Sequence, residues 1–295
     1  VLIDEANRRA AVGNNSYGYW AGGTPNTTKI SRLDFSNDGG GGVQKANVNY
    51  TRYGLSGTGN QDYGYMAGGF GPANVDRIDY GNDTTNALVR GPLNASRYGV
   101  AAFGNSSYGY WAAGYPESSS SVGTTIARLD YASDTSTAVL KGNLTESKYW
   151  VTGVANADYG YVGGGREQHD SSQPDFSNTT KLERIDFSND TATASLRGNL
   201  ANTPGSLKST SSNRNYGYVV GGSTVPSVSY VERIDYANDS ATALVRGPLG
   251  GPVRGSTAGA GNNDYGWHTG GMYALPSRTN YSLVERIDYS NDSST

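Results

Sequence analysis

Short stretches in which apolar and polar residues alternate recur along the whole chain, and turn-forming residues separate them. The segment 148–197 contains four such stretches, at 148–155, 159–163, 181–187 and 191–197. The first two are joined by Asn156-Ala-Asp158, and the last two by Ser188-Asn-Asp190. Alternation with a period of two is typical of β-strands, and Asn and Asp favour tight turns. The pattern therefore predicts four short antiparallel strands, with one longer loop between the second and the third.

This four-strand unit is repeated six times. Its second strand carries an aromatic–glycine–aromatic motif that begins at Tyr17, Tyr63, Tyr108, Tyr159, Tyr216 and Tyr265. Its third strand carries an Arg-Ile/Leu-Asp motif that ends at Asp34, Asp79, Asp130, Asp186, Asp235 and Asp288. Each Asp is followed by the next Tyr after 29 or 30 residues, whereas 16 to 27 residues separate each Tyr from the following Asp. The variation in length therefore falls in the connection between the second and third strands, which we call the variable loop.

A repeat of about 45–57 residues without a helical pattern is typical of propeller blades. We therefore expect an all-β fold in which residues 1–295 form a single six-bladed β-propeller of four-stranded antiparallel blades. The first strands are made of small residues, as in Ala10-Ala-Val-Gly13, which suits six strands crowded around one axis. The two rings of each aromatic motif lie on the same face of their strand, and we expect them to pack between blades.

The two ends of the chain suggest how the ring closes. Seven residues follow Asp288, and Val1-Leu-Ile3 matches Ala243-Leu-Val245 in the fourth strand of the fifth repeat. We expect Val1–Ile3 to pair beside Arg286–Tyr289, so that the N-terminal strand completes the last blade. The chain begins without Met, so we also expect a processed protein or a piece of a longer one.

The order of the motifs resembles the kelch repeat. Gly221-Gly222, Val231–Asp235, Leu244–Leu249 and Arg254 follow the kelch order, although the Trp of the fourth kelch strand is absent. The phrase at 77–93, followed by 97–105, resembles repeats in virion structural proteins of marine tailed phages. This resemblance implies a viral appendage, fibre or capsid-attached module whose partners are other virion or surface proteins. Similar repeats occur in bacterial surface proteins, so a secreted or cell-surface location is the alternative.

The composition of the chain excludes several kinds of site and argues against some partners. The chain has 42 Gly and 23 Tyr, and it has no Cys, which excludes disulfides, cysteine-ligated metals and thiol catalysis. The sequence has no apolar run near the roughly 20 residues of a membrane span, so we predict none. The net charge of −3 argues against a nucleic-acid partner.

Repeated polar residues favour structural roles over catalytic ones. A catalytic group is needed once, so six Arg–Asp motifs indicate ion pairs between blades, and we predict no catalytic residue and no enzyme. The Asp-rich turns, such as Asp79–Asp83, could bind Ca²⁺, although turns closed by Asx side chains are favoured, and we predict no cofactor. Basic residues near the first strands could ring one mouth of the channel or bind backbone carbonyls: Arg9, Arg52, Arg97, Lys148, Lys208 and Arg254.

Residues that do not repeat are the better candidates for function. Loops on a rigid scaffold commonly carry recognition, and the variable loops should all emerge on one face. The predicted binding residues of this loop face are Tyr115, His169, Asp170, Asp175, Phe176, Tyr230, Tyr273 and Tyr281. We expect a non-enzymatic module that recognises a host-surface glycan or protein.

Two other functions stay open. One is a purely structural assembly component. The other is a glycan-processing enzyme, which would need two carboxylates converging across one cleft, with Glu117, Asp170 and Asp175 as candidates.

Overall fold

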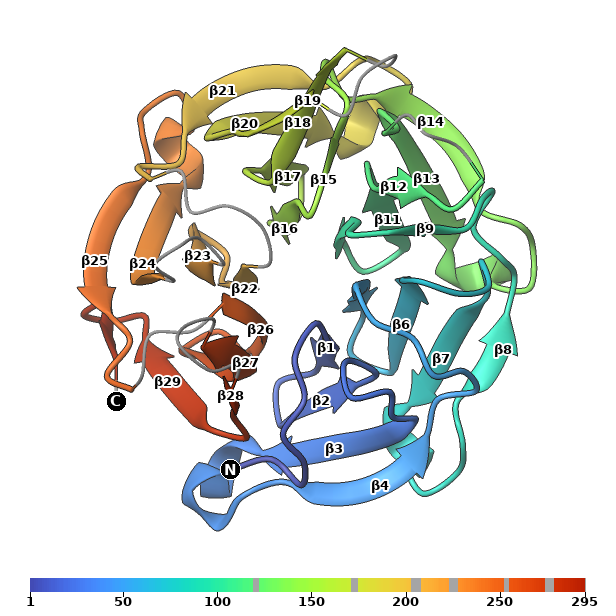
Figure 1. Cartoon of the computed structure of the whole chain (residues 1–295), viewed down its shortest axis with the longest axis vertical. Helices are drawn as coiled ribbons and strands as arrows, with labels where there is room; N and C mark the ends of the chain where they lie inside the picture. Colours follow the sequence, from blue (N-terminus) through green and yellow to red (C-terminus); the bar gives the residue numbers. More distant parts are fainter. Residues whose placement is uncertain are drawn as a thin grey trace.

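A computed structural model describes residues 1–118, 122–170, 175–202, 208–222, 228–251, 255–273 and 279–294. Nearly all regular structure in this part is β-strand (Figure 1). The described residues contain no helix long and apolar enough to cross a membrane.

Six sheets of at least four antiparallel strands follow one another along the chain, each with its strands in sequence order. The first sheet contains β1 (Ala10–Gly13), β2 (Tyr17–Ala21), β3 (Lys29–Asp34) and β4 (Val43–Asn47). The second contains β5 (Leu55–Gly59), β6 (Tyr63–Gly68), β7 (Val75–Asp79) and β8 (Leu88–Arg90). The third contains β10 (Ala101–Gly104), β11 (Tyr108–Ala112), β13 (Thr125–Asp130) and β14 (Val139–Asn143).

The remaining three sheets have the same order. The fourth contains β16 (Thr152–Ala155), β17 (Tyr159–Gly163), β20 (Lys181–Asp186) and β21 (Ser195–Asn199). The fifth contains β22 (Ser209–Ser212), β23 (Tyr216–Gly222), β24 (Val228–Asp235) and β25 (Leu244–Pro248). The sixth contains β26 (Gly255–Gly261), β27 (Tyr265–Tyr273), β29 (Val284–Asp288) and β30 (Ser293–Ser294), and β28 (Thr279–Asn280) also pairs with β27.

The six sheets stand around a common centre, with their first strands innermost and their fourth strands outermost (Figure 1). Each first strand contacts the first strand of the next sheet, in the cyclic order β1, β5, β10, β16, β22 and β26. Strand β26 contacts β1 in turn, so the cycle of contacts is complete. Small residues make this crowding possible: a Cβ on Gly57 would lie 2.6 Å from the Ala11 carbonyl oxygen of the preceding sheet.

The motifs of the second and third strands join neighbouring sheets. In the first sheet, the Tyr19 hydroxyl lies 3.0 Å and the Arg32 guanidinium 2.8 Å from the carboxylate of Asp83, which belongs to the second sheet. The same arrangement links each following sheet to the next through Asp134, Asp190, Asp239 and Asp292. From the sixth sheet, Trp267 and Arg286 bind Asp38 of the first sheet. We call each such carboxylate with its two donors an inter-sheet clamp.

The expected structural role of the Arg-Ile/Leu-Asp motifs is therefore confirmed, but the Arg and the Asp of one motif have different partners. The Arg pairs with the next sheet, whereas the motif's own Asp caps the short 3₁₀ turn that follows. Asp34, for example, accepts the Ser36 hydroxyl at 2.6 Å and the Ser36 N–H at 2.9 Å, and these two bonds lower the pKa of Asp34. The turns in question are η1 (Phe35–Gly40), η2 (Tyr80–Asn82), η3 (Tyr131–Ser133), η4 (Phe187–Asn189) and η5 (Tyr236–Asn238).

The expected role of the N-terminus is wrong. Strand β30 pairs with β29, as Ile287 with Ser294, and supplies the outer strand of the sixth sheet. Val1–Ile3 is not a strand: the Leu2 N–H donates to the Ser282 carbonyl, and the Val1 carbonyl accepts from Gly42. The Leu2 side chain is buried with Trp20, Phe35 and Trp267, so it fills the seam between the first and last sheets.

Strand boundaries also differ from the prediction in the fourth unit. The predicted strand 159–163 is confirmed as β17, but the stretch 148–155 is divided into β15 (Lys148–Tyr149) and β16. Trp150, between them, has a φ of 53°, which breaks the extended backbone. The predicted loop after β17 contains a hairpin of β18 (Arg166–Asp170) and β19 (Asp175–Asn178), which adds to β15.

Candidate functional site

A continuous band of aromatic rings crosses the second, third and fourth sheets at the end where the variable loops emerge. Three of its rings, Tyr53, Tyr98 and Tyr149, come just before the first strands of three consecutive sheets. The other three come from the variable loops of the same sheets: Phe70, Tyr115 and Phe176. We call these six rings the aromatic band.

Short ring-to-ring distances connect the band. Tyr53 stacks on Phe70 with centroids 5.7 Å apart, and Phe70 lies 6.1 Å from Tyr98. Tyr98 stacks on Tyr115 at 5.5 Å, supported by pairing of β9 (Arg97–Tyr98) with β12 (Tyr115–Pro116). Tyr149 meets Tyr115 at 5.5 Å and Phe176 at 5.2 Å.

The rings of the band are held in place, and all of them except Tyr149 remain accessible. Tyr53, Tyr98, Tyr115 and Phe176 are half-buried, Tyr149 is buried, and Phe70 is 51% exposed. Burial is the main cause that raises the pKa of Tyr98, so its hydroxyl stays protonated at neutral pH and can donate a hydrogen bond. The band therefore offers flat apolar faces edged by hydroxyl groups, a combination that suits amphipathic ligands.

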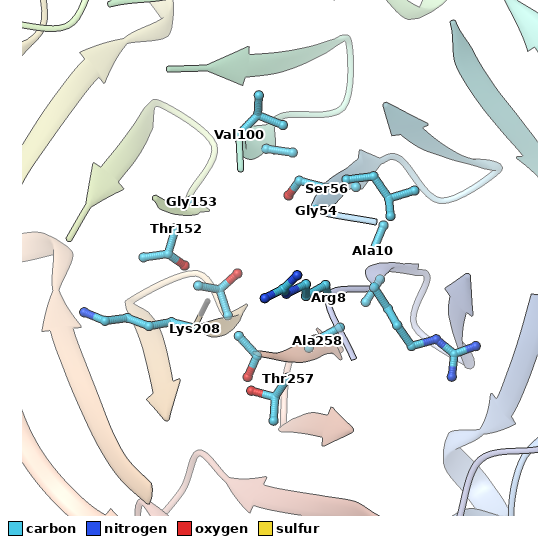
Figure 2. Close-up of a pocket in the computed structure, with 18 of the residues that line it drawn as sticks. Arg8, Ala10, Gly54, Ser56, Val100, Thr152, Gly153, Lys208, Thr257 and Ala258 are labelled. Carbon is cyan, nitrogen blue, oxygen red and sulfur yellow. The ribbon is translucent and has the colours of Figure 1, made fainter. Parts of the chain in front are cut away.

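The band adjoins a cavity of about 80 Å³ on the central axis, between the first strands of the sheets (Figure 2). Arg8 extends into the middle of this cavity, while Lys208 directs its amine away from it (Figure 2). The Arg8 guanidinium lies 5.6 Å from the ring centroids of both Tyr53 and Trp150. Trp150 in turn lies 5.4 Å from Tyr98, so the cavity and the band share one wall.

Left-handed backbone positions shape the mouth of this cavity. Equivalent residues of five sheets have positive φ, namely Arg8 (57°), Gly54 (71°), Gly99 (67°), Trp150 (53°) and Ser256 (63°). Backbone bonds join them in succession: Arg8 N–H to Ser256, Gly54 N–H to Arg8, and Gly99 N–H to Gly54. A Cβ on Gly54 would lie 2.9 Å from the Trp150 ring, so glycine leaves the space in which this indole lies across the mouth.

The band carries opposite charges at its two ends. At the Phe176 end, the Arg166 guanidinium lies 5.5 Å from the Phe176 centroid and donates to the Tyr149 hydroxyl at 3.3 Å. At the Phe70 end, the exposed Glu117 carboxylate accepts the N–H of Gly71 at 2.5 Å.

The structure brings together two of the eight predicted binding residues, Tyr115 and Phe176, in the aromatic band. Tyr230 on β24 is 42% exposed and makes no ring contact among the described side chains. Tyr281 is half-buried, and its backbone N–H donates to the Gly271 carbonyl.

The other four predicted residues are described in their backbone alone. His169, Asp170 and Asp175 lie on the β18–β19 hairpin, where Asp170 pairs with Asp175, and Tyr273 lies on β27 opposite Thr279. Their side chains lie outside the described residues.

Sequence reasoning missed Tyr53, Tyr98 and Tyr149, because each follows the basic residue of a first strand and was assigned to the repeat. It missed Trp150, because that residue was placed inside the predicted strand 148–155. A signal for them was available. A basic residue followed by Tyr occurs at 52–53, 97–98 and 148–149, in three consecutive repeats out of six.

The basic residues expected around the channel mouth mostly serve the sheets instead. Arg52 pairs with Asp76 at 2.5 Å and Lys148 with Glu183 at 2.5 Å, all four side chains being fully buried. Arg97 is buried as well, and Arg9 pairs with Asp4 at 2.6 Å. Arg254 lies outside the described residues, and the basic group at the centre of the mouth is Arg8.

The aspartates considered for Ca²⁺ are held by protein groups. In the turn Asp79–Asp83, Asp79 accepts the Gly81 N–H, and Asp83 receives the clamp donors Tyr19 and Arg32. Among the described residues, no three His, Asp or Glu side chains are grouped so that they could hold a metal ion.

Comparison with known proteins identified no relative: no family model matches the chain, and the search of curated proteins found no match.

Proposed function

We propose that the chain is a non-enzymatic recognition module that binds carbohydrate on the aromatic band. The observation that carries this proposal is the continuity of six rings over three sheets, five of which are accessible. Sugar rings present apolar C–H faces and hydroxyl edges, and stacked aromatic faces edged by Tyr hydroxyls match both. The cavity beside Trp150 is lined mainly by small residues of the first strands, whereas the rings that can stack on a sugar lie along the band, which favours binding on the surface of the band.

We infer that the scaffold is a six-bladed, kelch-like β-propeller. The cyclic contacts of the six first strands support this, as do the inter-sheet clamps that link the last sheet to the first. Such a scaffold would present the variable loops on one face and hold the band rigidly. Rigid presentation favours binding, because little conformational entropy is then lost on association.

The setting that we propose is a virion appendage that recognises a host-surface glycan. Its support is the resemblance of the repeats to those of virion structural proteins, together with a loop face that differs from sheet to sheet. Mass measurement of the intact protein purified from its natural particle, with its two terminal sequences, tests this setting.

The test of carbohydrate binding is a glycan array, followed by calorimetry with the sugars that bind. Phe70→Ala removes the most exposed ring of the band, and Tyr230→Ala removes a comparably exposed ring outside it. We expect Phe70→Ala to weaken binding about tenfold, because base–aromatic stacking, a comparable contact, is worth about 1–3 kcal/mol. Tyr230→Ala should bind like the wild type. Equal binding by Phe70→Ala and the wild type would contradict the assignment to the band.

A second candidate function, assembly with other proteins, is favoured by the outer strands. Each outer strand from the first to the fifth sheet exposes one or two aliphatic side chains: Val43, Leu88, Val89, Val139, Leu140, Leu196, Leu244 and Val245. Apolar groups repeated around a rim suit contact with a protein that surrounds it. Solution mass tests this candidate: a protein that stays bound to a partner during purification would support it, and loss of that partner in Val139→Ser/Leu140→Ser would locate the contact.

A further inference from the structure

We propose that the band recognises an acidic sugar, and that Arg166 binds its carboxylate at the Phe176 end. This inference rests on the proposed carbohydrate binding and adds the chemical class of the ligand.

Arg166 is placed to receive an anion. It stands at the start of β18, half-buried, beside the rings of Tyr149 and Phe176. Within the described part of the chain it forms no ion pair, and its one side-chain hydrogen bond goes to the Tyr149 hydroxyl at 3.3 Å. A guanidinium has five N–H donors, so most of the donors of Arg166 remain for a ligand.

Among the described side chains, no carboxylate near Arg166 pairs with it. Glu167 points to the other side of the strand, is buried, and pairs with Lys181 at 3.2 Å. Glu117 is bonded to Gly71, next to Phe70 at the opposite end of the band. Asp170 follows four residues later on β18, which is about 13 Å along an extended strand.

The geometry of the Arg166 guanidinium suits a carboxylate ligand. Guanidinium and carboxylate are both planar and can form two parallel hydrogen bonds, which adds direction to the charge attraction. A sugar that stacks on Phe176 would bring an exocyclic carboxylate to the plane of Arg166. Glu117 disfavours an acid at the Phe70 end. The band therefore orients an acidic sugar with its carboxylate toward β18.

The experiment compares sugars that differ only in charge. A galacturonate trimer is compared with its methyl ester, and 3′-sialyllactose with the methyl ester of its sialic acid, by calorimetry at low and high salt. The two pairs distinguish a uronic from a sialic acid as the source of the carboxylate. Each sugar is measured with the wild type, Arg166→Gln, Arg166→Lys, and Arg214→Gln as the control. Arg214 is exposed on the β22–β23 turn, at the end of the fifth sheet opposite its variable loop.

We expect one acidic member to bind at least tenfold more tightly than its neutral partner, with the difference reduced at high salt. Arg166→Gln should remove that difference, Arg166→Lys should keep part of it, and Arg214→Gln should keep all of it. Equal binding of acidic and neutral partners overturns this inference but leaves carbohydrate binding standing. An acidic preference that survives in Arg166→Gln also overturns it. Absence of binding to all four sugars and to the glycan array would overturn both proposals.

Discussion

The guanidinium of Arg286 lies 3.1 Å from the carboxylate of Asp38, although the two residues are 248 positions apart in the chain. Trp267 donates to the same carboxylate at 2.9 Å, in the place where a Tyr hydroxyl donates in the other clamps. This clamp joins the last sheet to the first. It differs from the others in its exposure, because the Asp38 side chain is 28% accessible whereas that of Asp190 is 7% accessible.

The clamps should therefore contribute unequally to stability. Asp190→Ala leaves Tyr110, Arg128 and Lys141 without their buried carboxylate, and we expect it to lower the free energy of unfolding by about 3 kcal/mol. Asp38→Ala should cost about 1 kcal/mol, because solvent screens an exposed pair. Denaturant unfolding of both variants checks this order, and a larger loss in Asp38→Ala would contradict it.

Two buried arginines at equivalent positions should respond differently to the same substitution. Arg52 pairs with Asp76, whereas Arg97 has no carboxylate partner among the described residues, because Ala127 stands where Asp76 stands. Burial correspondingly lowers the pKa of Arg97 to about 10. Arg52→Met leaves the buried Asp76 carboxylate without its ion-pair partner and should lower the free energy of unfolding by about 3–5 kcal/mol. Arg97→Met should lower it by about 1 kcal/mol. Similar losses in the two variants would show that the carboxylate is not the cause.

The contribution of Lys208 to stability should increase with pH above about 8. Its amine nitrogen is buried without a hydrogen-bond partner among the described residues, and burial lowers its pKa from 10.5 to about 8, against the opposing effect of Glu232. Between these two values the unfolded chain binds a proton that the folded chain has released, so the free energy of unfolding rises with pH.

Lys208 should contribute a rise of about 1–2 kcal/mol from pH 8 to 9.5. Tyrosines of the unfolded chain begin to ionise in this range, and because burial raises the pKa values of tyrosines such as Tyr98 in the fold, their ionisation opposes the rise. The Lys208 contribution is therefore the pH dependence of the wild type minus that of Lys208→Met in denaturant unfolding, a difference in which the tyrosine effect cancels. If that variant keeps the same pH dependence as the wild type, another group is responsible.

Glycine at position 99 should be needed to hold Trp150 in place. Gly99 has a φ of 67°, and a Cβ there would lie 2.8 Å from the Trp150 backbone nitrogen. Gly99→Ala should destabilise the fold by about 1–3 kcal/mol and shift Trp150. Gly247→Ala is the matched control, because nothing lies within 4 Å of a Cβ at that position. Thermal unfolding measures the loss, and equal melting temperatures for the two variants would contradict this account.

The repeat made most of the sheet arrangement predictable. Alternation and fixed spacing predicted the bounds of the second strands closely, as at 159–163. The Tyr-Gly-Tyr pattern sets both the register of these strands and the face on which each side chain lies. The prediction for the N-terminus was wrong because three consecutive apolar residues do not specify which strand they pair with or in which register. Leu2 is buried, as its hydrophobicity suggests, but as a plug beside Trp20 and Trp267 rather than as a strand.

The site was less predictable than the sheets. Tyr115 and Phe176 were found because they stand in loops of unequal length. Tyr98 and Tyr149 were set aside as repeat residues, although the third and fourth sheets bring them together with Tyr115. A single sequence does not reveal which loop residue meets which strand residue across two sheets, because that contact depends on how the sheets are placed.

The most direct test of carbohydrate binding on the band is a fluorescence titration that isolates Trp150. Trp20, Trp111 and Trp267 are fully buried between sheets, whereas Trp150 is half-buried and contacts Tyr98 and Tyr149. We predict that a sugar identified on the glycan array changes the emission in a saturable way in the wild type, and that Trp150→Phe loses this change while calorimetry still detects binding. A saturable change that persists in Trp150→Phe, or wild-type binding without any change, would contradict recognition at the aromatic band.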